Sequence, residues 1–179
     1  MNQEEFGKGE NIQYPEIAEE IAAMHEADQD MRKRSALNNF IIESEEDRTL
    51  DDRNTARMKD VVAEIGWPTI SKVGKEIASN AWCLVQHADH DVGFQKHCLS
   101  LMKEQSESEV LPADVAYLED RVRVNSEQLQ IYGTQLQEIN GEDMPREIED
   151  REHVDERRRA VGLNTMAEYL EHFREKYKK

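Results

Sequence analysis

The chain is poor in cysteine and has no long apolar run, and both absences restrict the kind of protein it can be. Only two of its 179 residues are cysteines, Cys83 and Cys98. On one helix these two thiols would stand about 22 Å apart at 1.5 Å of rise per residue, too far for a disulfide. We therefore expect reduced thiols and a cytoplasmic protein. No stretch is long and apolar enough to span a bilayer, and we do not expect the polar, acidic segment 1–10 to be a secretory signal.

Positive charge is also scarce. The chain has 23 lysines and arginines against 39 acidic residues, for a formal net charge of -16. Nucleic-acid backbones and anionic membrane surfaces both require clustered cations, so we expect no nucleic acid and no membrane among the partners. A cationic protein partner is compatible with the charge, although a high net charge by itself indicates only solubility.

With 8 glycines and 4 prolines, the chain has few helix breakers, and the apolar residues between them recur at helical spacing. Gly66 and Pro68 end the second helix, and Gly93 lies inside the third and could divide it in two. The expected helices cover residues 15–37, 51 or 52 to 65, 69–102, 113–120 and 165–177. The first has an apolar stripe of Ile17, Ile21, Met24 and Ala27, and the second has one of Met58, Val61, Val62 and Ile65.

A change of period predicts one β-hairpin. Residues alternate over 121–124 and again over 129–132, with a four-residue turn at 125–128. The predicted fold is therefore mainly α, a single helical domain with one short β-hairpin. Its expected parts are a disordered tail over 1–14, a helical core with the hairpin over 15–137, an acidic loop over 138–156 and a helical segment over 157–179.

Three polar residues share the apolar stripe of the third helix. His87, Asp91 and Gln95 are spaced i, i+4, i+8, so neighbours in the series can touch. A buried polar group without a hydrogen-bond partner costs about 1–3 kcal/mol. We therefore expect each of these side chains to have a hydrogen-bond partner in the protein or a role in binding or catalysis. We predict that His87 is a general base or acid and that Asp91 orients it. A purely structural pair is the alternative. His90 and His97 point away from the stripe and should be dispensable.

Residues outside this helix complete the predicted site. Gln95, Gln135 and Tyr132 would bind the substrate, the two glutamines through hydrogen bonds. Arg57 and Arg121 would hold an anionic group. For Arg57, and for the pair of Asp28 and Arg32 spaced i, i+4, the more common alternative is a group that supports a helix surface. We predict no metal, because only His87 with His90 or Asp91 could share an ion and the sequence identifies no further ligands. The cofactor stays open, and no glycine-rich phosphate loop or nucleophile motif is present.

The chain contains five longer motifs with several polar residues each. They are Gly66-Trp67-Pro68-Thr69-x-Ser71-x-Val73-Gly74, Gln86-His87-Ala88-Asp89-x-Asp91-x-x-Phe94-Gln95, Tyr117-Leu118-x-Asp120-Arg121-Val122, Gln130-x-Tyr132-Gly133-Thr134-Gln135 and Val154-Asp155-x-Arg157-Arg158-x-x-Val161-Gly162-Leu163. These motifs resemble a family of bacterial proteins of unknown function, over about residues 15–170. The resemblance implies that the polar signatures belong together, which favours one shared pocket, but it implies no activity. The sequence departs from the family at the predicted turn, where Asn125-Ser126-Glu127-Gln128 stands in place of a glycine-containing turn.

The leading functional prediction is a cytoplasmic enzyme that uses histidine acid–base chemistry on a polar or anionic small molecule. Two other classes stay open. One is an acidic protein-interaction module, antitoxin-like or immunity-like, which needs no pocket. The other is a ligand sensor that binds in the same pocket without turnover.

Overall fold

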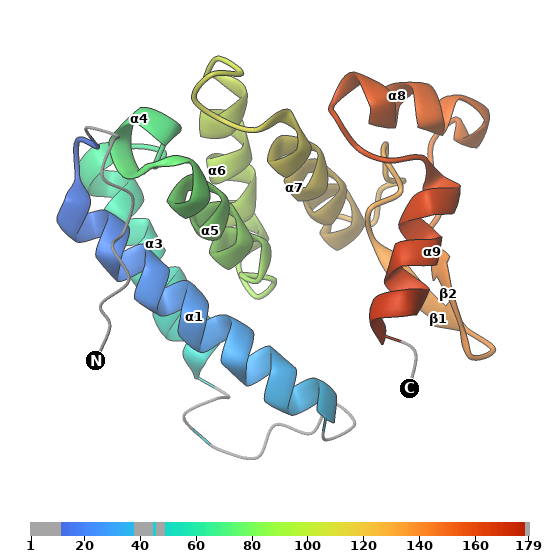
Figure 1. Ribbon diagram of the computed structural model, residues 1–179, viewed down its shortest axis with the longest axis horizontal. Helices are drawn as coiled ribbons and strands as arrows, with labels where there is room; N and C mark the ends of the chain where they lie inside the picture. The colour runs from blue at the N-terminus through green and yellow to red at the C-terminus, as the bar shows by residue number, and fades with distance from the viewer. Residues whose placement is uncertain (1–11, 38–44, 46–48, 178–179) are drawn as a thin grey trace. The chain divides into compact units, whose positions relative to one another are not determined.

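The computed structural model describes residues 12–37, 45 and 49–177, and it divides the chain into two compact units, residues 1–87 and 88–179. The described residues are mainly α-helical with one two-stranded sheet, which confirms the predicted fold class (Figure 1). Residues 1–11 of the expected tail lie outside the described part. The backbone amides of Gln13 and Tyr14 donate to the carbonyls of Ser71 and Lys72.

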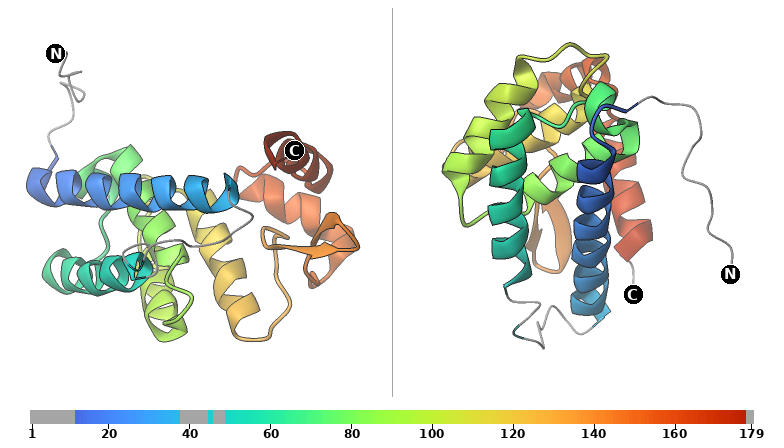
Figure 2. Two further views of the ribbon diagram at one scale, coloured as in Figure 1. Left: turned by 90° about the horizontal axis from the view of Figure 1, so that it is seen from below. Right: turned by 90° about the vertical axis from the view of Figure 1, so that its left-hand side faces the viewer.

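The first unit contains four helices in its described part: α1 (Pro15–Leu37), α3 (Leu50–Ile65), α4 (Ile70–Val73) and α5 (Lys75–Gln86). α1 packs against α5 and also lies beside α3, as two views show (Figures 1 and 2). This packing brings the second half of α1 next to the end of α5, although about fifty residues separate them in the sequence.

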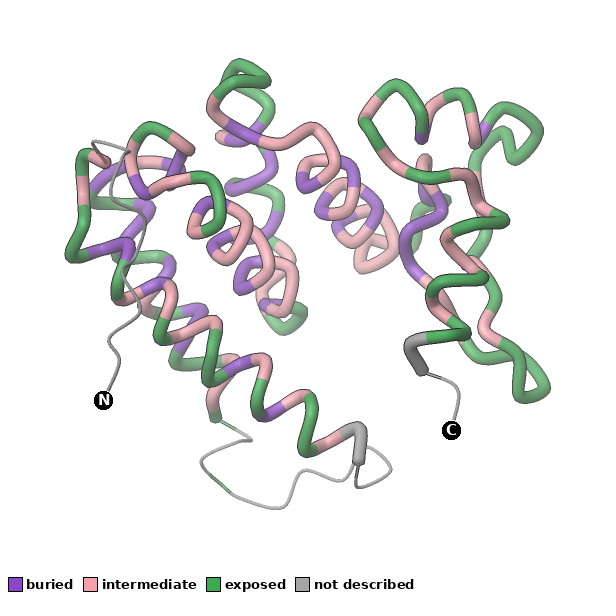
Figure 3. The backbone as a smooth tube through the Cα atoms, in the orientation of Figure 1, coloured by how far each residue is buried: buried purple, intermediate pink, exposed green. Residues whose placement is uncertain are grey.

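The core of this unit follows the stripe predicted for α3 and only part of the one predicted for α1. Along α1, Ile17 and Ile21 are buried as predicted, but Met24 is half-buried and Ala27 is exposed. The buried stripe continues instead through Asp28, which has no exposed surface, and Met31. Buried segments recur along the helices of Figure 3 at this spacing. The stripe predicted for α3 is confirmed, since all four of its members are buried: Met58, Val61, Val62 and Ile65.

Two helix boundaries lie at glycines, and only the one at Gly66 was predicted. Gly66 follows α3 with a positive φ of 69° and donates its amide to the carbonyl of Val62, as a helix-ending glycine does. Gly74 has φ 89° and separates α4 from α5. This backbone conformation is disfavoured for residues with a Cβ.

The helix predicted over 69–102, which Gly93 could have divided in two, is divided at two places. Gly74 separates α4 from α5, and the chain leaves the helical path again after α5 and re-enters it at α6 (Val92–Lys103). This second break precedes Gly93, which lies in the first turn of α6. Asp91 caps that turn, since its side chain accepts a hydrogen bond from the amide of Phe94 at 2.9 Å. An aspartate cap of this kind favours a new helix start over continuation of the old one.

The second unit begins with α6, which packs against α7 (Pro112–Asn125). Strands β1 (Leu136–Ile139) and β2 (Glu142–Pro145), the 3₁₀ helix η1 (Arg151–His153), α8 (Val154–Ala160) and α9 (Met166–Tyr177) follow, and α9 lies against β2. None of the described helices of either unit has the length and apolar character that a membrane span needs.

The hairpin exists but not at the predicted place. Residues 121–124 continue α7, because Leu118 and Val122 are both buried one turn apart and hold the helix against its neighbours. The real hairpin turns at Asn140-Gly141, inside the segment predicted to be an acidic loop, with Ile139 paired to Glu142. Both turn residues have positive φ, 56° and 82°, as a two-residue hairpin turn requires.

Candidate functional site

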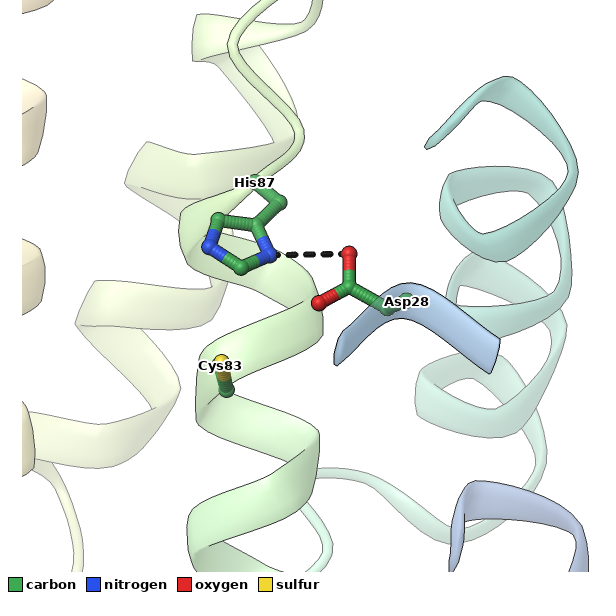
Figure 4. Close-up of side chains that lie close together, drawn as sticks. All are labelled: Asp28, Cys83 and His87. Atoms are coloured by element: carbon green, nitrogen blue, oxygen red, sulfur yellow. Dashed lines mark hydrogen bonds and ion pairs between the residues drawn. The ribbon is translucent and has the colours of Figure 1, made fainter. Parts of the chain in front are cut away.

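A histidine and a buried carboxylate meet in the first unit. His87 follows the last turn of α5, and its Nδ1 lies 2.9 Å from Oδ1 of Asp28 on α1. The Asp28 side chain is fully buried, whereas 17% of the His87 side chain is exposed. The ring turns Nδ1 toward Asp28 and its other nitrogen away from it (Figure 4).

Arg32 lies one helical turn after Asp28 and reaches the same atoms. Its Nε is 3.1 Å from Asp28 Oδ1 and 2.9 Å from His87 Nδ1. Its Nη2 is 2.7 Å from Oδ1 of Asp51, at the start of α3. The Arg32 side chain is 35% exposed, so the guanidinium joins the buried carboxylate to the surface of the unit.

These contacts allow two proton arrangements on the His87 ring. With a proton on Nδ1, the ring donates to Asp28, and Nε2 is a free base. With Nδ1 bare, it accepts from Arg32 Nε, and Nε2 carries the proton of the neutral ring. Within the described part of the chain, the hydrogen bonds of this ring all run through Nδ1. Nε2 is therefore the nitrogen that can exchange a proton with another molecule.

The charges around His87 are fixed by their neighbours. Burial alone would raise the pKa of the Asp28 carboxyl. The hydrogen bond to His87 and the charge of Arg32 lower this pKa by more than burial raises it, so it lies below its usual value. Burial lowers the pKa of Arg32, and the carboxylates of Asp28 and Asp51 more than offset this. Burial also lowers the pKa of nearby His25. Asp28 is thus an anion and Arg32 a cation at neutral pH.

A thiol lies in the same cluster. Cys83 precedes His87 by one turn of α5, and its Sγ accepts a weak hydrogen bond of 3.6 Å from Gln29 Nε2. One ligand atom each from Asp28, Cys83 and His87 lie within 4.8 Å of one another (Figure 4). These are the three side-chain types that most often bind zinc.

Asp91 does not have the predicted geometry. Its role as the partner of His87 depended on an uninterrupted helix, and the chain leaves the helix between the two residues. Asp91 is the cap of α6, and Asp28 supplies the carboxylate at Nδ1 of His87. From the sequence, Asp28 and Arg32 were expected only as a pair one helical turn apart.

The second unit brings three of the predicted binding residues together around Asp89. Arg121 donates through Nε to Asp89 Oδ1 at 2.8 Å and through Nη2 to Oδ2, and its Nη1 donates to Oε1 of Gln135 at 2.9 Å. Asn125 Nδ2 bridges Asp89 Oδ1 at 2.8 Å and Gln95 Oε1 at 3.0 Å. We call these five residues the Asp89 network.

Both arginines predicted to hold an anion already hold a carboxylate of the chain. Arg121 pairs with Asp89, and Arg57 makes two hydrogen bonds of 2.6 Å with Glu20. Burial alone would raise the pKa of Asp89. Arg121 and the side-chain amides of the network lower this pKa by more than burial raises it, so it lies below its usual value. An external anion would have to compete with these internal carboxylates.

Two buried charged residues, Asp120 and Arg158, hold the segment around Tyr132 in place, and neither was among the predicted site residues. The Asp120 carboxylate accepts the amides of Ile131 at 2.6 Å, Tyr132 at 3.0 Å and Thr134 at 2.9 Å. Arg158 Nη1 donates to the carbonyl of Tyr132 at 2.7 Å. Arg158 is 1% exposed. It is one of three consecutive arginines, 157–159, and the sequence does not indicate which of them is buried.

His87 belongs to the first unit and the Asp89 network to the second, so one pocket containing both stays a prediction. In the comparisons with known proteins, residues 15–179 match the model of DUF6624, which is described as a family of unknown function. No curated protein and no solved structure matches the chain.

Proposed function

The chain belongs to DUF6624, a family of unknown function, and from the geometry of its own residues we propose that it is an enzyme. The reaction is acid–base chemistry at His87 on a polar or anionic small molecule. The observation that carries this proposal is the fully buried Asp28 carboxylate 2.9 Å from His87 Nδ1. A carboxylate in this position orients an imidazole and stabilises its protonated form.

The proton is exchanged at Nε2. As a base, His87 takes the proton there, and the resulting imidazolium is stabilised by Asp28 through Nδ1–H. As an acid, the ring returns the proton from the same atom. In this proposal Asp28, and not Asp91 as the sequence suggested, is the carboxylate that orients His87. His87 keeps its predicted role as general base or acid.

Arg32 is the group best suited to hold an anionic substrate. Its guanidinium contacts the His87 ring and is 35% exposed. A carboxylate or phosphate bound to Arg32 would therefore lie next to the base. Gln95, Arg121, Tyr132 and Gln135 remain candidate substrate contacts of the second unit, supported by the polar groups gathered around Asp89.

The proposed location is the cytoplasm of a bacterial cell. The location is supported by the two cysteines, since neither forms a disulfide and reduced thiols persist in that compartment. The bacterial origin is supported by the motifs that resemble bacterial proteins.

The test is a turnover screen with matched histidine variants. The full chain is incubated with a panel of phosphorylated and carboxylated metabolites, and products are detected by NMR. We expect wild type and His97→Gln to form a product, because His97 is exposed. His87→Gln should lose about 10²–10⁴-fold in rate, the usual contribution of a general acid or base.

Each other outcome favours a different class. A metabolite that binds at His87 without product formation favours the ligand sensor. A panel without binders, together with native mass spectrometry of the chain from its own host showing a bound protein, favours the acidic interaction module. Equal activity of His87→Gln and wild type would refute the assignment of His87.

A further inference from the structure

The cluster of Asp28, Cys83 and His87 has the composition of a metal site. Cys83 lies on α5 and His87 is the residue that caps its end, four residues later and with helical φ and ψ, so their side chains emerge on the same face. Asp28 approaches them from α1, and the three ligand atoms lie within 4.8 Å of one another. Around a tetrahedral zinc ion such atoms are roughly 3.4–3.8 Å apart, so a small side-chain movement would close the set.

A cationic group already occupies the place between two of these ligands. Arg32 Nε lies 3.1 Å from Asp28 Oδ1 and 2.9 Å from His87 Nδ1. Asp28, Asp51 and Arg32 together carry a net charge of about minus one at neutral pH, because two carboxylates face one guanidinium. The surroundings therefore favour a further positive charge.

We propose that Asp28, Cys83 and His87 bind a divalent ion of the zinc type, which takes the place of Arg32 Nε. The ligands are one carboxylate oxygen, the Cys83 thiolate and His87 Nδ1, with water in the fourth position. The Cys83 thiol loses its proton to solvent as the metal–sulfur bond forms. Arg32 withdraws from His87 and keeps its partner Asp51, which lies at the surface end of its guanidinium.

The mixture of ligands selects the ion. Thiolate and imidazole prefer zinc and related borderline ions, whereas magnesium and calcium prefer a shell of oxygen atoms. Because the ion holds His87 Nδ1, it prevents the Nδ1–H contact with Asp28 that the proposed acid–base role needs. Zinc would therefore inhibit the proposed reaction, but its binding can be measured without any activity.

The experiment is a cobalt titration of the full chain, prepared metal-free and without a histidine tag. Co²⁺ reports thiolate ligation through a near-ultraviolet charge-transfer band and tetrahedral geometry through its visible bands. We expect both bands in wild type and their loss on addition of one equivalent of Zn²⁺. Cys98→Ser, which changes the other cysteine, should keep them.

Two variants have opposite expected effects. Cys83→Ser should lose the charge-transfer band and weaken zinc binding by about tenfold or more. Arg32→Met removes the competing cation and should tighten zinc binding. Circular dichroism of each variant establishes that it is folded, and the gain in Arg32→Met cannot arise from misfolding.

The proposal is overturned if wild type gives no charge-transfer band, or if the band survives in Cys83→Ser. Unchanged zinc affinity in Arg32→Met would also overturn it, since the ion would then not share the place of the guanidinium. Cobalt binding with no turnover in the metabolite screen would leave the metal site standing and refute only the enzyme.

Discussion

Asp28 shows how one buried charge can be held by three neighbours of different kinds. Its carboxylate accepts hydrogen bonds from Gln29 Nε2 at 2.9 Å and Arg32 Nε at 3.1 Å, besides its contact with His87. Each neighbour offsets part of the cost of removing the carboxylate from water. The group is therefore stable only as a set, and the loss of one member affects the others.

We expect Asp28→Ala to lower the free energy of unfolding by about 1–3 kcal/mol, because it leaves partly buried donors without an acceptor. Urea denaturation beside wild type measures the change. Asp30→Ala is the matched control on the exposed face of α1, and it should change stability by less than about 0.5 kcal/mol. Equal stability of Asp28→Ala and wild type would show that the donors find water instead.

The pH dependence of stability has a definite sign at this residue. The folded-state pKa of Asp28 is lower than its ordinary value of 3.8, so the stability that it contributes is complete above that pH and is lost as the pH falls through the folded pKa. Wild type should therefore lose stability in acid more steeply than Asp28→Asn. Urea midpoints from pH 5 downward measure this, and parallel slopes would contradict it.

At the scale of elements, substitutions of Asp91 test its structural role as the N-cap of α6. We expect Asp91→Ala to lower stability by about 1 kcal/mol, the usual cost of losing a helix N-cap. Asp91→Asn and Asp91→Ser keep a capping oxygen and should stay close to wild type. Thermal or urea unfolding of the three variants decides the matter, and losses of equal size in all three would indicate that the negative charge itself is needed.

Gly133 lies where a side chain has no room. Its φ is 71°, and a Cβ there would lie 2.7 Å from Met166 Sδ and 2.8 Å from Ile148 Cδ1. Gly133→Ala should therefore cost about 1–3 kcal/mol. Gly162 has a similar φ of 76° with nothing within 4 Å of the Cβ position. Gly162→Ala is thus a control for backbone strain alone, and a loss as large as that of Gly133→Ala would refute the steric explanation.

The elements that the sequence predicted well are those whose pattern is long. The stripe of α3 runs over several turns and was predicted in full, whereas the stripe predicted for α1 departs from the buried one at Met24 and Ala27. The alternation over 121–124 was too short to distinguish a strand from a helix. The Asn140-Gly141 turn was a stronger hairpin signal, but the acidic residues around it favoured a loop.

The candidate site was predictable only in part, for a related reason. His87 was found because a polar residue on an apolar helix needs a partner. Asp28 occupies the same kind of position, seven residues after buried Ile21 and three before buried Met31, so the period of α1 could have indicated it. That the two residues meet is set by the packing of α1 on α5, and no local pattern contains this information.

At the scale of the whole molecule, the dominant property is negative charge. The excess of 39 acidic over 23 basic residues gives a net charge of -16, and like charges repel more strongly in a compact chain than in an unfolded one. Exposed ion pairs oppose this only weakly, since each contributes about 0–1 kcal/mol. Repulsion should therefore outweigh the local pairs in the response to salt.

We expect the temperature of unfolding at pH 7 to rise when sodium chloride is increased from low concentration to about 0.15 M, where charges are screened beyond roughly 8 Å. Differential scanning calorimetry measures the shift. The same salt step near the sequence pI of about 4.8 is the control, because net repulsion nearly vanishes there and the increase should be much smaller. A decrease at pH 7 would mean that favourable pairs such as Arg121 with Asp89 contribute more to stability than the net charge removes.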